Sequence, residues 1–130
     1  MTAAEIDDLA GRLFAAIERG DIDAVARCYQ PDVAVWHSPS GREQTREQNL
    51  ALLSLLSRRC SDWRYEDVRR EIFADGFVQQ HVLRLRNARG VPVEIPVCIV
   101  VRLRDGAIAR IDEYLDGAAA APLFDGLEPG

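Results

Sequence analysis

The stretch "VVRLRDGAIARIDEYLD", residues 100–116, decides the fold of this chain. Apolar and charged side chains alternate on both sides of Asp105-Gly106, and such a dipeptide between alternating runs is a strong hairpin signal. We therefore predict antiparallel strands at about 92–104 and 107–116. The same period of two recurs at about 63–73 and 77–87, with turn signals between the segments. Four strands joined by short turns predict an antiparallel meander.

The N-terminal part of the chain has helical spacing instead. Thr2 and Glu5 form a capping box, and the apolar stripe that follows them stops at Gly20. A second short helix is predicted from Asp21 to Tyr29, because Pro31 cannot continue it.

A short strand is predicted at 33–37, followed by a loop at "SPSG". A third, leucine-rich helix follows, capped either by Ser40 with Glu43 or by Thr45 with Gln48. The tail "GAAAAPLFDGLEPG" is expected to add one helical turn before it frays. The predicted order is helix, helix, strand, helix and then four strands.

This order predicts a single α+β domain over residues 1–130, in which a strongly curved, antiparallel or mixed sheet wraps around about three helices. The helices can bury their apolar stripes only against one face of the sheet. The strand from Val93 to Leu103 also carries Pro96, Cys98 and Val100 on its other side. We therefore expect a homodimer packed through the outer face.

Composition excludes several classes of protein. The chain has 16 basic and 21 acidic residues, a net charge of −5 and no block of like charges, so no nucleic-acid partner is expected. No apolar run approaches the roughly 18 residues of a membrane span, and the acidic, amphipathic start does not resemble a secretory signal. Three cysteines without a CxxC pair favour a reducing compartment. We expect a cytoplasmic protein.

Glu113 is the unusual residue of the closing strand, since it shares a side with Ala109, Ile111 and Leu115. A buried, unpaired carboxylate costs several kcal/mol or becomes protonated, so Glu113 is expected to find a partner or to line a cavity. The chain has two histidines, His37 and His81. Either could form an acid–base pair with this carboxylate, and a purely structural hydrogen bond between His81 and Glu113 is the alternative.

The strings "GDIDAVARCYQPDVAVWHSP" and "VVRLRDGAIARIDEYLD" resemble the nuclear transport factor 2-like superfamily over nearly the whole chain. The sequence is most similar to its SnoaL-like, polyketide cyclase-like branch, which is related to ketosteroid isomerases and limonene epoxide hydrolases. The resemblance implies a cone-shaped, cystatin-like α+β fold around a hydrophobic pocket.

The resemblance also implies roles for single positions. His37 stands where the isomerases have a proton-shuttling aspartate, His81 where the hydrolases have an arginine, and Glu113 at the hydrolases' catalytic aspartate. Four positions depart from these families. Leu13 and Ile99 replace the isomerases' oxyanion-stabilising tyrosine and aspartic acid, while Val35 replaces a tyrosine and Leu83 an aspartate of the hydrolases. The familiar steroid isomerase and epoxide hydrolase activities are therefore not expected.

The sequence thus predicts a protein that binds a small apolar molecule and acts on it by acid–base chemistry without an organic cofactor. The expected catalytic residues are His37, His81 and Glu113, and the expected pocket residues are Val35, Gln79, Leu83, Ile99 and Ile111. The two histidines and Glu113 also have the composition of a metal site, but their spacing gives it no support, so no metal is predicted. A non-catalytic ligand-binding protein and a protein-interaction module of the same fold remain alternatives.

Overall fold

The structure, a computed structural model, describes residues 1–127 of the chain. The elements in chain order are α1 (Ala3–Glu18), α2 (Ile22–Cys28), β1 (Tyr29–His37), β2 (Arg42–Gln44), α3 (Arg46–Arg59), β3 (Ser61–Phe73), β4 (Gly76–Arg86), β5 (Pro92–Arg104), β6 (Ala107–Leu115), α4 (Gly117–Ala120) and the 3-10 helix η1 (Ala121–Phe124). The expected fraying of the tail concerns residues 128–130, which lie outside the described residues.

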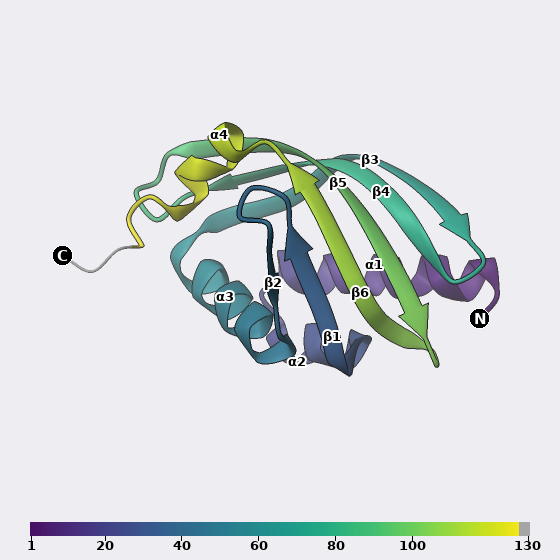
Figure 1. Ribbon diagram of the computed structural model, residues 1–130. Helices are drawn as coiled ribbons and strands as arrows, with labels where there is room; N and C mark the ends of the chain where they lie inside the picture. Colours follow the sequence, from purple (N-terminus) through teal and green to yellow (C-terminus); the bar gives the residue numbers. More distant parts are fainter. Residues whose placement is uncertain (128–130) are drawn as a thin grey trace.

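One curved sheet of six strands is the frame of the molecule, with the order β2-β1-β6-β5-β4-β3. The meander β3 to β6 is antiparallel as predicted, whereas β1 runs parallel to β6. Helices α1, α2 and α3 lie on the concave side, and α4 with η1 lies at one end of the sheet (Figure 1). The α+β prediction, with a mixed, unclosed sheet around helices, is confirmed.

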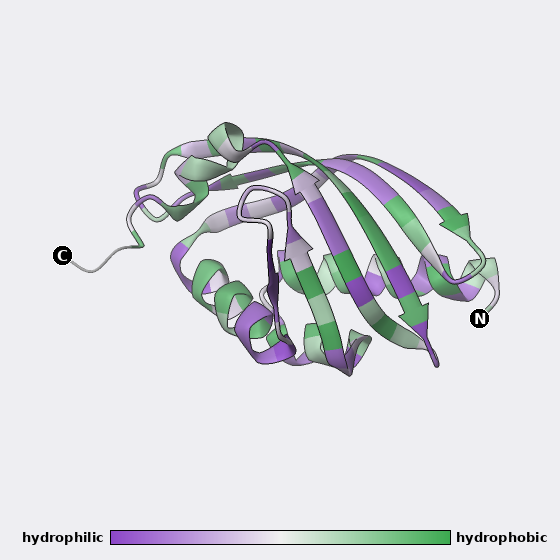
Figure 2. Ribbon diagram, viewed as in Figure 1, coloured by the Kyte–Doolittle hydropathy of each residue, from purple (hydrophilic) through white to green (hydrophobic). Residues whose placement is uncertain are grey.

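The predicted alternation places the core on the concave face. Hydrophobic and hydrophilic bands alternate along β5 and β6 (Figure 2). Val93, Ile95, Val97, Ile99 and Val101 of β5 are all buried. The stripe of α1 packs against this face, so helices and sheet share one core.

Both helices with a capping box begin where the sequence places them. The side chains and backbones of Thr2 and Glu5 exchange hydrogen bonds at the start of α1, as do those of Thr45 and Gln48 at the start of α3. The alternative cap at Ser40 is therefore wrong, because residues 42–44 pair with β1 as a short strand that the sequence did not indicate.

The first strand is longer than predicted. It begins at Tyr29, not at Val33, so α2 ends at Cys28. Pro31, which lacks a backbone N–H, lies where the pairing of β1 with β6 changes register between Tyr29 and Ala34. Pro31 therefore prevents the helix from continuing, and it is still part of β1 because the strand pairing is irregular at this position.

Candidate functional site

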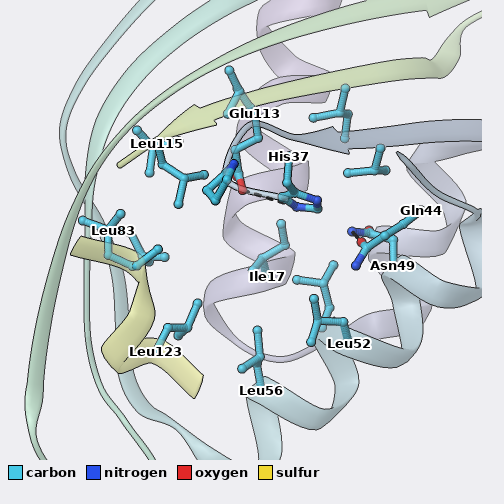
Figure 3. A pocket seen from close by; sticks show the side chains of 18 of the residues that line it. Ile17, His37, Gln44, Asn49, Leu52, Leu56, Leu83, Glu113, Leu115 and Leu123 are labelled. Carbon is cyan, nitrogen blue, oxygen red and sulfur yellow. Dashed lines mark hydrogen bonds and ion pairs between the residues drawn. The ribbon is translucent and has the colours of Figure 1, made fainter. Parts of the chain in front are cut away.

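A cavity of about 410 Å³ lies between the concave face of the sheet and the helices. Leucine and isoleucine side chains dominate its wall, among them Ile17, Leu52, Leu56 and Leu123 (Figure 3). Ligand pockets of proteins typically fall in this range of size and combine an apolar wall with a few polar groups. The polar groups of this cavity come mainly from β1, β2, β4, β6 and α3.

Four of the five residues expected in a pocket wall line this cavity. They are Val35, Leu83, Ile99 and Ile111, each from a different strand. The fifth, Gln79, is not part of the wall. It is fully buried behind it and is hydrogen-bonded to Arg70 of β3.

Glu113 and His37 meet at the cavity surface. They occupy paired positions on the parallel strands β6 and β1, so their side chains leave the sheet on the same face. Nε2 of His37 lies 3.3 Å from Oε1 of Glu113 (Figure 3). The carboxylate side chain is 31% accessible although protein surrounds it, because that surface borders the cavity.

Burial shifts the pKa values of this pair in opposite directions. Loss of water raises the pKa of Glu113 from 4.5 to about 7. The same cause lowers the pKa of His37 below 6.5. The two shifts reverse the ordinary order of the two pKa values, so a protonated Glu113 beside a neutral His37 is favoured between them, which places an acid next to a base.

His81 also lines the cavity, but its partner is not the expected one. Its Nδ1 lies 3.0 Å from Nε2 of Gln79, and no hydrogen bond or ion pair joins it to Glu113 within residues 1–127. The structural pair of His81 with Glu113 is therefore wrong. The ring is packed edge-on between Phe14 and Tyr65, at centroid distances of 5.6 and 4.8 Å.

Sequence reasoning missed a polar wall next to His37. The Tyr29 hydroxyl donates to Oδ1 of Asn49 at 2.7 Å, and Nδ2 of Asn49 donates to Oε1 of Gln44 at 3.0 Å. All three residues line the cavity, and Figure 3 shows Gln44 and Asn49 close to His37. In the sequence, the one signal of this polar wall is Asn49, an asparagine within the leucine stripe of α3.

The three expected catalytic residues do not assemble a metal site. Within the described part of the chain, no three metal-ligating side chains gather at one point. His37 and Glu113 lie together, while Nδ1 of His81 faces an amide.

No described helix has the length and apolar character needed to cross a membrane.

The chain matches a known protein family. Residues 10–111 match the family model of the SnoaL-like domain, so the chain belongs to the SnoaL-like family. The predicted membership is confirmed. A search of curated proteins finds no match.

Solved structures share the fold at low sequence identity. An LEH-like epoxide hydrolase of M. tuberculosis is 19% identical, with 96% of this chain and 93% of that chain covered and a TM-score of 0.79. A candidate polyketide cyclase of Xanthomonas campestris is 20% identical, with coverages of 88% and 92% and a TM-score of 0.77. A protein of Catenulispora acidiphila with a ketosteroid isomerase-like fold, solved in complex with trimethylamine, is 15% identical, with coverages of 85% and 87% and a TM-score of 0.75. At these identities the likeness shows the fold alone.

Proposed function

We propose that the protein is an enzyme that binds a small, mostly apolar molecule in the cavity and acts on it by acid–base chemistry of the isomerase, cyclase or hydrolase type. The observation that carries this proposal is the 3.3 Å contact between His37 and Glu113 at the surface of an apolar cavity. Membership of the SnoaL-like family, and a fold shared with a candidate polyketide cyclase and an epoxide hydrolase, agree with this reaction class.

The pair supplies both an acid and a base at neutral pH. Protonated Glu113 can give its proton to a substrate oxygen, while neutral His37 can take a proton from the substrate or from water. The low-polarity wall strengthens both interactions, because water that would screen them is displaced when a substrate binds. No organic cofactor is needed for such a proton exchange.

Turnover of a substrate panel tests this proposal. Cyclic enones, epoxides and β-keto esters are incubated in D2O, and mass spectrometry follows products and deuterium incorporation. For any substrate found, Glu113→Gln and His37→Asn should each lower kcat/KM by about 100-fold or more. Glu71→Gln, an exposed glutamate on β3, is the matched control. Unchanged turnover in both site variants contradicts the proposal.

A non-catalytic ligand-binding protein is the second candidate. It is favoured by Leu13 and Ile99, which line the cavity where hydrogen-bond donors could stabilise a developing negative charge. A ligand that copurifies with the protein, binds tightly and is recovered unaltered after long incubation supports this candidate over the enzyme.

We also propose that the protein forms a homodimer through the outer face of the sheet. Cys98 and Val82 are only half-buried there, and Tyr114 and Val68 are 49% and 45% accessible. Trp36 packs edge-on against Tyr114 at a centroid distance of 5.2 Å. Val68, Val82, Cys98 and Tyr114 border a hollow on a face that none of the described helices covers.

The cytoplasm is the proposed location. Cys28, Cys60 and Cys98 are all free, as thiols are in a reducing compartment. Cell fractionation of the host organism tests this, and recovery of the protein in a secreted fraction contradicts it.

A further inference from the structure

Four side chains form a hydrogen-bonded chain from the protein surface to the cavity. Oδ1 of Asp7 on α1 accepts from Nη1 of Arg70 at 2.8 Å. Nε of Arg70 donates to Oε1 of Gln79 at 2.8 Å, across the paired positions of β3 and β4. Nε2 of Gln79 then reaches Nδ1 of His81 at 3.0 Å. The chain ends at the imidazole ring that lines the cavity.

The direction of each hydrogen in this chain is fixed by chemistry. A guanidinium can only donate, so the amide of Gln79 must turn its oxygen toward Arg70 and its NH2 group toward His81. An amide NH2 group can only donate in its turn, so Nδ1 of His81 must accept. A neutral imidazole that accepts at Nδ1 carries its proton at Nε2. In the charged imidazolium Nδ1 also carries a hydrogen, which would point at the N–H of the Gln79 amide, so this form is disfavoured.

We propose that Arg70 and Gln79 are positioning residues that hold His81 as the neutral Nε2–H tautomer, so that the ring offers a fixed hydrogen-bond donor to an uncharged oxygen of the cavity ligand. Nε2 has no hydrogen-bonded partner within residues 1–127, although the ring lines the cavity. The edge-on contacts with Phe14 and Tyr65 fix the plane of the ring.

The charges around His81 agree with a neutral ring. Tyr65 packs against it from β3, and burial raises the pKa of that phenol. Arg70 is hydrogen-bonded to Gln79, which lies between it and the ring, and Glu113 lies across the cavity on β6. Asp67 and Arg69 of β3 line, together with His81, the hollow on the outer face, and neither is hydrogen-bonded to the ring. Burial lowers the pKa of His81 to about 4. No carboxylate within the described residues is hydrogen-bonded to the ring to reverse this.

The sheet register gives the second contact point of the ligand. Gln79, Ile99, Glu113 and His37 form one row across four strands, and His81 lies two residues along from that row. At about 4.8 Å between strands and about 3.3 Å per residue along them, the backbones at His81 and Glu113 are roughly 12 Å apart. A small ligand can therefore touch His81 with one oxygen and the His37–Glu113 pair with a neighbouring group. This assignment of an uncharged carbonyl or ether ligand rests on the proposed function, whereas the tautomer does not.

Nitrogen NMR of histidine tests the tautomer without any substrate. Long-range 15N–1H spectra of 15N-histidine-labelled protein are recorded from pH 5 to 8, and His37→Asn leaves His81 as the only histidine signal. We expect a protonated Nε2, an unprotonated Nδ1 and no titration over this range. A protonated Nδ1, or a ring that titrates near pH 6.5, overturns the proposal.

Replacing the amide of Gln79 separates positioning from simple packing. In Gln79→Glu the carboxylate accepts from Arg70 and also from Nδ1 of His81, so the ring should gain a proton at Nδ1 and its pKa should rise. Gln80→Glu, an exposed neighbour on β4, adds the same charge and should leave the spectrum of His81 unchanged. If Gln79→Glu also leaves it unchanged, Gln79 does not set the tautomer.

Two probes of the same shape test the ligand class. Acetophenone carries a carbonyl oxygen where α-methylstyrene has a methylene group. Acetophenone should shift the Nε2–H signal of His81 downfield, and α-methylstyrene should not. Equal effects of the two, or no effect of either at millimolar concentration, contradict the oxygen contact while the tautomer result stands. Loss of turnover alone bears on the proposed function and not on this assignment.

Discussion

Nε2 of His37 lies 3.3 Å from Oε1 of Glu113, at paired positions of the parallel strands β1 and β6. Glu113 is an acid in a row of apolar side chains, and the strand pairing gives it His37 as a partner. Burial raises the pKa of Glu113 and lowers that of His37, so the protonated acid beside a neutral imidazole is the favoured form at pH values between the two pKa values.

Glu113→Gln should stabilise the protein at pH 8 and change its stability little at pH 5. The pKa of Glu113 rises from 4.5 to about 7 on folding, so the native state holds this proton more tightly and loses stability as the pH rises through that window. The shift corresponds to about 3 kcal/mol. Urea denaturation of both proteins at the two pH values measures it, and a stability difference independent of pH contradicts it.

A larger side chain inside the cavity should abolish ligand binding and preserve the fold. Leu52 lines the cavity from α3, so Leu52→Trp should fill part of it at a cost of about 1–3 kcal/mol. Binding of a fluorescent apolar dye should weaken at least about 10-fold, a difference of about 1.4 kcal/mol. Ala51→Trp places the same side chain on the exposed side of the helix and serves as the control. Equal dye binding by both variants argues against a cavity that is accessible to ligands.

The side chains of Tyr29 and Asn49 in the polar wall should be energetically coupled. Tyr29→Phe removes the donor to buried Asn49, and Asn49→Leu removes the acceptor of the Tyr29 hydroxyl, so each should cost about 1–3 kcal/mol. The double variant should cost less than the sum, with an interaction energy of at least about 0.5 kcal/mol. Chemical denaturation of the four proteins gives the cycle, and strict additivity would show that the 2.7 Å hydrogen bond stabilises nothing.

Tyr114→Arg should convert the proposed dimer into a monomer. The substitution places a charge among the apolar side chains of the outer face, where a partner would have to bury it. Analytical ultracentrifugation at micromolar concentration should show a dimer for the unmodified chain and for the control Ala51→Arg, and a monomer for Tyr114→Arg. A monomeric unmodified chain contradicts the proposed dimer.

Local signals explain why much of the fold could be predicted. The capping boxes at Thr2 and Thr45 and the hairpin signal at Asp105-Gly106 depend only on neighbouring residues. Alternation along β4 correctly put Gln79 and His81 on the buried face. These elements required no knowledge of which strands pair.

The remainder depends on register, which no local pattern contains. Two irregularities in β3, at Asp62 and Asp67 with φ of 54° and 55°, interrupt the alternation, so the inward direction of Arg70 could not be counted from sequence. The strand 42–44 consists of polar residues and gave no signal. The contact between His37 and Glu113 likewise arises from the parallel pairing of β1 with β6, two strands that are far apart in the sequence.

Titration of the Glu113 carboxyl carbon by 13C NMR tests the central claim most directly. Difference spectra against Glu113→Gln identify its signal. The account predicts a midpoint near pH 7 for Glu113, because the buried acid keeps its proton beside a neutral His37. A midpoint near 4.5, its ordinary value, would contradict the acid–base role proposed for this cavity.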